Sequence, residues 1–177
     1  MNEKKKIALA LAACAAHEET YGTTVPARLR ELWKSGEAFR AHGRCLPPKT
    51  SLPGFETGSF RVASVPPSWD YLGNMGGLDD AISGEGGEWK HAGSFLPIFL
   101  LKQSRLLVAD LDDPSFPVGY YEDETFRSKS KGWDRGVYRI APSLEAFLGT
   151  LVERDSADFE TELDDGPWED AAEEADD

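Results

Sequence analysis

The chain has 177 residues, of which 40% are hydrophobic and 29% charged, so it is long and apolar enough for one globular domain with a sizeable core. Its formal net charge is −13, which disfavours direct nucleic-acid binding because that function needs a basic surface. The two cysteines are too few for a disulfide framework, and this indicates a reducing compartment, with the cytoplasm as the expected location.

The N-terminal segment, residues 1–23, allows two interpretations. A basic start followed by the apolar stretch Ile7–Ala13 is the outline of a secretory signal, and Leu11–Cys14 resembles the lipobox of bacterial lipoproteins. The alternative is a helix rich in alanine and leucine, with its apolar side chains on one face. We favour the helix because the apolar stretch is at the lower limit for a signal. A lipoprotein anchored through Cys14 remains the alternative location, and no stretch is long enough to span a bilayer.

A second helix is predicted after residue 23. Thr24 is the expected N-cap, and Pro26 falls in the first turn, where proline loses no helical hydrogen bond. Gly36 is expected to weaken or end the helix. Four apolar side chains recur at helical spacing and are expected in the core: Leu29, Leu32, Trp33 and Phe39.

The middle of the chain contains many proline and glycine residues and one strand candidate, Phe60–Val65, in which apolar residues alternate. Its glycines match neither a dinucleotide fingerprint nor a P-loop. His42 and Cys45 are three residues apart, but no second pair completes a zinc site. His17 and His91 also lack a nucleophile partner, so neither a cofactor nor a metal site is predicted.

Four short apolar runs follow in quick succession and are predicted to be strands: Phe95–Leu101, Leu106–Leu111, Pro117–Tyr121 and Val137–Ile140. Short turns between consecutive strands imply an antiparallel meander. Ser143 is the expected cap of a helix over 144–152 that packs on the sheet. The predicted fold class is therefore α+β, a twisted, mainly antiparallel sheet with N-terminal and C-terminal helices packed on it.

Asp110 and Asp112 form a D-x-D pattern at a strand end. In phosphatases of this type one carboxylate is the nucleophile and both bind magnesium, but that motif ends the first strand of a parallel sheet. Here it lies within a meander, and the Asp112-Asp113-Pro114 turn accounts for the acids. A magnesium-dependent hydrolase is therefore the weakest of the functional hypotheses, and we predict that the chain is not an enzyme.

The C-terminal segment, residues 153–177, holds thirteen acidic residues and one basic residue, which leaves the rest of the chain almost neutral. Such a run repels itself and buries little apolar surface, so we expect a disordered acidic tail. One role is to solubilise the protein, and another is to mimic nucleic acid for a basic partner. Phe159, Leu163 and Trp168 favour the second role, because an inert tail has little use for them.

The region 24–152 resembles the SUKH superfamily, which includes the fungal Smi/Knr cell-wall-assembly regulators and many bacterial immunity proteins. The resemblance rests on the order and spacing of several short motifs: Val25-Pro26 with Leu29 and Leu32-Trp33, then Trp89, Leu96-Pro97-Ile98, Leu107–Asp110, Pro117-Val118 and Ala141–Leu148. It implies an α+β fold and a non-catalytic protein-binding role.

For a bacterial member, the resemblance implies neutralisation of a toxin, often a nuclease, and acidic residues would suit a basic toxin. The alternative is a regulatory or adaptor module of the Smi/Knr type with no toxin partner. The expected partner is thus a protein, with no nucleic acid, and with no membrane unless Cys14 is lipidated. Candidate partner-binding residues are Trp89, Asp110, Asp112, Asp113, Glu122, Asp123, Glu124 and Trp168.

Overall fold

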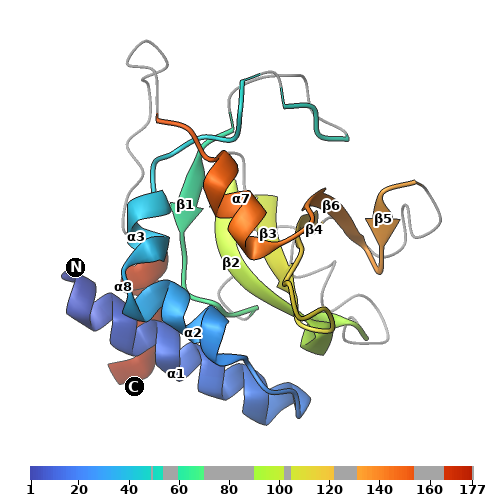
Figure 1. Cartoon of the computed structure of the whole chain (residues 1–177). Helices are drawn as coiled ribbons and strands as arrows, with labels where there is room; N and C mark the ends of the chain where they lie inside the picture. Colours follow the sequence, from blue (N-terminus) through green and yellow to red (C-terminus); the bar gives the residue numbers. More distant parts are fainter. Residues whose placement is uncertain are drawn as a thin grey trace.

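The structure is a computed structural model that describes residues 1–48, 50–53, 60–69, 90–101, 105–121, 131–153 and 166–176. Helices lie against a six-stranded antiparallel sheet, so the predicted α+β class is confirmed (Figure 1). The strands are β1 (Val62–Ser64), β2 (Phe95–Leu101), β3 (Arg105–Asp110), β4 (Val118–Tyr121), β5 (Trp133–Asp134) and β6 (Val137–Ala141). The helices are α1 (Glu3–Tyr21), α2 (Ala27–Lys34), α3 (Glu37–Ala41), the 3-10 turn η1 (Ala92–Ser94), α7 (Leu144–Thr150) and α8 (Gly166–Asp176).

The strands stand in the order β1-β2-β3-β4-β6-β5, and each neighbouring pair is antiparallel. The predicted meander is therefore correct for β2, β3 and β4. After β4 the chain passes to the outer edge, where β5 forms a hairpin with β6, and β6 then pairs with β4. The very short strand β5 was not predicted.

The sheet is buried on both faces. Along β3, Leu107 and Ala109 join the larger core, which includes side chains from the helices, whereas Leu106 and Val108 join a smaller cluster around Trp69 on the opposite face. This split follows from the two-residue period of a strand. It also explains why β2 is apolar at nearly every position instead of alternating.

Residues 1–23 form a helix that is part of the domain. Asn2 caps α1 by accepting a hydrogen bond from the backbone N–H of Lys5 at 2.9 Å, and the helix ends at Gly22, whose φ of 68° lies in the left-handed region. Cys14 is fully buried on the inner face of α1. In the structure this segment is therefore helical from Glu3 to Tyr21, and Cys14 belongs to the core.

Helix α2 begins later than expected, so the prediction that Thr24 caps it is wrong. Its N-cap is Pro26, in an extended conformation and without a side-chain cap hydrogen bond. The backbone N–H of Val25 instead donates to the Glu18 carboxylate of α1 at 3.0 Å. As expected, Gly36 interrupts the helix: its φ of 80° separates α2 from α3.

The acidic tail is ordered in part. The prediction of disorder is wrong for residues 166–176, which form α8, while residues 154–165 lie outside the described residues. Trp168 is 1% exposed, and its Nε1–H donates to the carbonyl of Ser64 at 3.0 Å. Burying an indole removes roughly 150–250 Å² from water, which stabilises by about 4–6 kcal/mol. Burial of this one side chain therefore stabilises a helix in a segment whose charge predicts disorder.

No helix within the described ranges has the length and apolar character needed to cross a membrane.

Gly119 in β4 permits the close approach of β6. A Cβ at this position would lie 2.4 Å from Val137 Cγ1 and 2.6 Å from the carbonyl oxygen of Tyr138, and the second of these is backbone that cannot rotate away. We expect Gly119→Ala to lower the free energy of unfolding by about 2 kcal/mol or more, as measured by chemical denaturation.

Gly149 in α7 is the matched control for that substitution. A Cβ there meets nothing within 4 Å, so Gly149→Ala should leave stability unchanged or raise it by up to about 1 kcal/mol. Equal losses in the two variants would show that β4 and β6 are not packed in this way.

Burial controls the reactivity of Cys14. It raises the pKa of the thiol to about 11, so little thiolate exists at neutral pH. In a Cys45→Ser variant, which removes the other thiol, we expect Cys14 to react with a thiol-specific dye only after denaturant is added. Rapid labelling of the folded protein at pH 8 would contradict the docked position of α1.

Candidate functional site

The structure brings together only some of the candidate partner-binding residues. Asp110, Asp112 and Asp113 share the turn after β3. Trp168 lies in the core instead of on the surface, because its indole fills the space between α8, α3 and β1. The other four candidates are outside the described residues: Trp89, Glu122, Asp123 and Glu124.

The turn after β3 is organised by its own carboxylates. Asp110 Oδ1 accepts a hydrogen bond from the backbone N–H of Asp112 at 2.9 Å. Asp113 Oδ1 accepts from the hydroxyl and the backbone N–H of Ser115, at 2.7 and 2.9 Å. These two bonds, the hydroxyl first, lower the pKa of the Asp113 carboxyl below its ordinary value. The acids thus fix the turn, as the sequence pattern suggested.

Arg135, between β5 and β6, gathers three carboxylates that are separate in the sequence. Its Nη2 lies 2.8 Å from Asp110 Oδ2 and 2.8 Å from Asp134 Oδ2, and its Nη1 lies 2.7 Å from Asp112 Oδ2. The Asp110 side chain is only 8% exposed, whereas those of Asp112 and Asp134 are more than half exposed. One guanidinium thus neutralises a buried acid and leaves two carboxylates at the surface.

The hydrogen bonds around Arg135 change the ionisation of both partners. The bond from Arg135 is the main reason why the pKa of the Asp134 carboxyl is lowered. The same bond, with the attraction of the nearby carboxylates, raises the pKa of the guanidinium. Asp134 and Arg135 are therefore both charged at neutral pH.

The backbone of Arg135 adopts an uncommon conformation. Its φ is 51°, in the left-handed region that non-glycine residues seldom occupy, and Gly132 and Gly136 on either side also have positive φ. The guanidinium carbon lies 4.6 Å from the centre of the Phe95 ring, in cation–π geometry. The tight β5–β6 hairpin and its contacts hold this arginine over the end of β3.

This geometry gives the D-x-D carboxylates a structural role. Asp110 and Asp112 both bind Arg135, so one guanidinium pairs with both carboxylates of the D-x-D pattern. Across the described part of the chain there is no group of three His, Cys, Asp or Glu side chains placed to bind a metal ion. The arrangement is suited to holding a turn and presenting charge.

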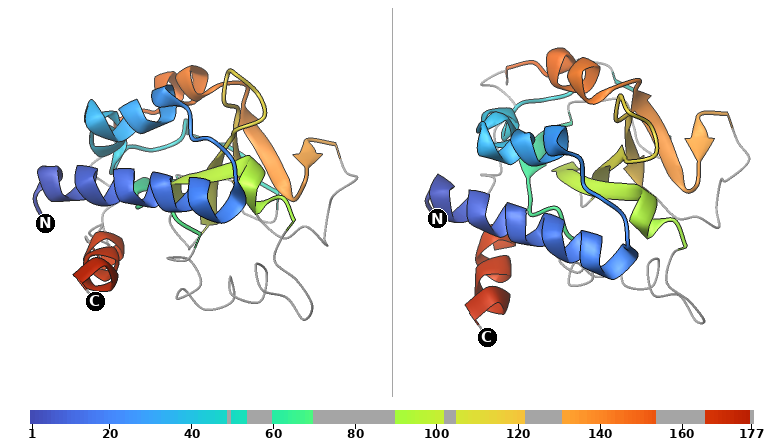
Figure 2. Two further views of the ribbon diagram at one scale, coloured as in Figure 1. Left: turned by 90° about the horizontal axis from the view of Figure 1, so that it is seen from below. Right: turned by 60° about the horizontal axis from the view of Figure 1, so that its bottom comes forward.

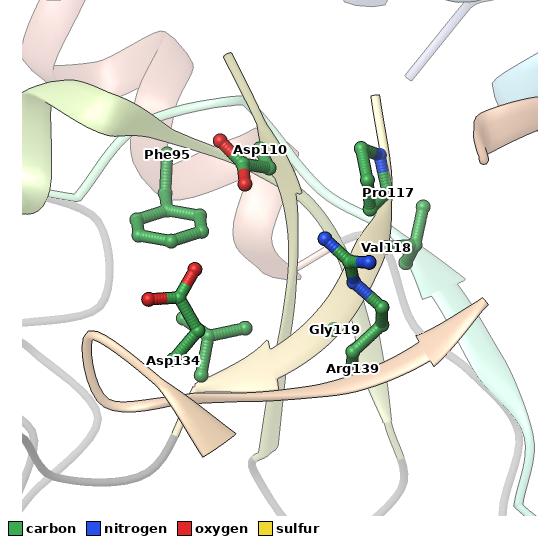
Figure 3. A pocket seen from close by; sticks show the side chains of 8 residues that line it. Phe95, Asp110, Pro117, Val118, Gly119, Asp134 and Arg139 are labelled. Carbon is green, nitrogen blue, oxygen red and sulfur yellow. The ribbon is translucent and has the colours of Figure 1, made fainter. Parts of the chain in front are cut away.

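A shallow hollow lies beside the cluster, between β3, β4 and β6 (Figure 3). Its cavity volume is about 20 Å³, enough for roughly one water molecule and far less than the roughly 300–1,000 Å³ of typical organic-ligand sites. The Asp110 and Asp134 carboxylates lie on the side of Phe95, and the Arg139 guanidinium lies toward Pro117 and Val118. The hollow thus carries both signs of charge but has no room for an organic ligand.

Arg135 is not among the residues predicted from the sequence to form a site. The available signal was the Gly132-Trp133-Asp134-Arg135-Gly136 run, whose flanking glycines are typical of a tight hairpin. Nothing in the spacing shows that this hairpin faces the Asp110 turn, because the two are separated by residues 122–130 and meet only through the pairing of β4 with β6.

Two of the histidines have structural surroundings. His17 is 4% exposed, its Nε2 lies 3.4 Å from the carbonyl oxygen of Gly93, and burial lowers the pKa of its ring. His42 Nδ1 accepts the backbone N–H of Ser64 at 3.0 Å. Each ring thus holds two segments of the fold together.

Comparison of the chain with protein-family models, curated proteins and solved structures found no match in any of the three. The resemblance to the SUKH superfamily therefore rests on the motifs of the chain itself.

Arg135→Gln is expected to destabilise the fold by about 1–3 kcal/mol, because it leaves the nearly buried Asp110 carboxylate without its counterion. Arg139→Gln is the matched control, since Arg139 is exposed and also lines the hollow. Chemical denaturation of both variants measures the difference. If the two lose the same stability, Arg135 does not hold the turn.

The stability lost in Arg135→Gln should depend on pH. The pKa of Asp134 is lower in the folded state than in the unfolded chain. The ion pair of Asp134 with Arg135 therefore contributes fully to folding stability at pH values above the ordinary pKa of aspartate. This contribution disappears as the pH falls through the lowered pKa. The gap between wild type and variant should therefore be constant from neutral pH to about pH 5 and narrow below about pH 4. Denaturation midpoints across this range test it, and a gap that widens in acid would contradict it.

Proposed function

We propose that this chain is a non-catalytic protein-binding domain of the SUKH type that neutralises a bacterial toxin, with a basic protein such as a nuclease as the partner. The resemblance of the motifs between Val25 and Leu148 supports the family. The observation that carries the choice of partner is the net charge of −13, nearly all of which belongs to residues 153–177.

Ordered elements present part of this acidity. Helix α8 turns Trp168 and Ala172 inward, and its acidic side chains are exposed: Glu169, Asp170, Glu173, Glu174 and Asp176. The Arg135 cluster adds the exposed carboxylates of Asp112 and Asp134. A surface whose charges are held in place steers a basic partner and loses less side-chain freedom on binding than a disordered one.

We propose a cytoplasmic location for this activity. The two cysteines, Cys14 and Cys45, are both buried and not joined by a disulfide, which is compatible with a reducing compartment. An immunity protein there would meet a toxin after the toxin has entered the cell or before it is secreted.

Toxin neutralisation can be tested by affinity capture followed by a growth assay. We expect the full-length chain to retain a basic protein from its native cells at low ionic strength. Expression of that protein alone should arrest growth, and co-expression of the chain should restore it. Recovery of only non-toxic proteins, or a growth defect on deletion of the chain without any toxin, would favour the regulatory alternative.

The role of the acidic face of α8 can be separated from that of net charge. Glu173→Gln/Glu174→Gln removes two charges from α8, and Glu19→Gln/Glu31→Gln removes two exposed charges from α1 and α2. We expect the first pair to slow association with the captured protein by about 3- to 10-fold at low salt, and the second to have a much smaller effect. Surface plasmon resonance measures both rates, and equal slowing would show that only net charge matters.

A further inference from the structure

Helix α8 is attached to the rest of the domain through one narrow face. Trp168 and Ala172, four residues apart, are the buried positions, and the acidic side chains point outward. Figure 2 shows α8 passing beside the N-terminal half of α1, close to the N-terminus. This pattern is typical of a short amphipathic helix bound in a groove.

Three elements form the groove around Trp168. The Phe39 ring of α3 lies 5.9 Å from the indole, and Lys6 Nζ of α1 lies 5.9 Å from the ring centre. Ser64 of β1 supplies the polar contact, because its carbonyl accepts the indole N–H at 3.0 Å. The groove thus offers an aromatic wall, a cation and one hydrogen-bond acceptor, which together select a tryptophan.

The polar contact uses the outer edge of β1. Ser64 pairs with Phe99 of β2 in the sheet, and its own N–H and carbonyl face away from β2. They bind the side chains of His42 and Trp168, whereas the equivalent groups of Val62 bind the backbone of residues 43 and 44. The edge of β1 is therefore covered by backbone at Val62 and by the side chains of His42 and Trp168 at Ser64.

Helix α8 has little stability of its own. Its eleven residues fall below the roughly 12–15 that isolated helices need. Glu169 and Glu173, like Asp170 and Glu174, are four residues apart and repel each other. Its last turn holds acids and no basic residue, which opposes the helix dipole. The helix therefore exists because the groove binds it, in the manner of coupled folding and binding.

We propose that the groove between α1, α3 and the outer edge of β1 is a binding site for an acidic helix anchored by a tryptophan, and that α8 occupies it as an exchangeable intramolecular ligand. When the α8 helix of the same chain leaves the groove, the groove accepts the α8 segment of a second copy of the chain. This inference does not depend on the identity of any toxin, because it concerns the exchange of a segment of the chain itself.

The test uses the full-length chain and a labelled peptide of residues 161–177. In a Trp168→Ala chain the anchor is missing, so the groove should be vacant and bind the peptide saturably. The wild-type chain should bind it about ten-fold more weakly or worse, because its own α8 occupies the groove for most of the time. The matched control peptide carries Trp168→Ala at unchanged charge and should bind neither chain. Fluorescence anisotropy measures all four combinations.

A second variant controls for effects of Trp168→Ala other than the release of α8 from the groove. Ala172→Glu keeps the tryptophan but places a charge at a position that is 7% exposed, and it should also open the groove to the peptide. In wild type, hydrogen exchange should be faster in α8 than in β3, since undocking does not require global unfolding.

Two results would overturn the proposal. If both variants lose cooperative unfolding, α8 is an integral part of the core and not a ligand of it. If they stay folded but the wild-type peptide binds no better than its Trp168→Ala control, the groove is not a site for this helix.

Discussion

Burial of β2 and β3 on both faces is the constraint on which the rest of the structure depends. A strand with one wet face can be completed by a single layer of helices, but a strand that is apolar on both faces needs cover on two sides. Helices α1, α2, α3 and α7 supply cover on one side, while Trp69, η1 and the end of α1 supply it on the other. Helices α1, α2, α3 and α7 are therefore required by the sequence of the central strands.

Ion pairs among the described residues connect the elements that form these layers. Arg28 binds Glu37 at 2.9 Å and Glu145 at 2.7 Å, which joins α2 to α3 and α7. Arg135 joins the β5–β6 hairpin to the turn after β3. In both cases one guanidinium serves several carboxylates, which suits the planar, multi-donor geometry of arginine. An acidic protein can use a few arginines in this way and still present an acidic exterior.

How far the sequence predicts the structure depends on how local each signal is. Strands β2, β3 and β4 were predictable because their apolar runs and turns are adjacent in the chain. The start of α7 was equally predictable, because Ser143 accepts the backbone N–H of Ala146 as its cap, at 3.0 Å. Helix α8 was missed because composition averages all of residues 153–177, whereas one of them, Trp168, anchors the helix. The Arg135 cluster was missed because it depends on the pairing of β4 with β6, and a contact between distant segments produces no periodic pattern in the sequence.

The position of α8 has a consequence for the order of events during synthesis. Its partners, α1, α3 and β1, all precede it in the sequence, and β2, β3 and β4 also emerge earlier. The sheet can therefore assemble on the ribosome while the Ser64 carbonyl and the apolar wall at Phe39 are still uncovered. If α8 exchanges between copies, as proposed, this interval is the one in which the groove is uncovered without α8 first having to leave it.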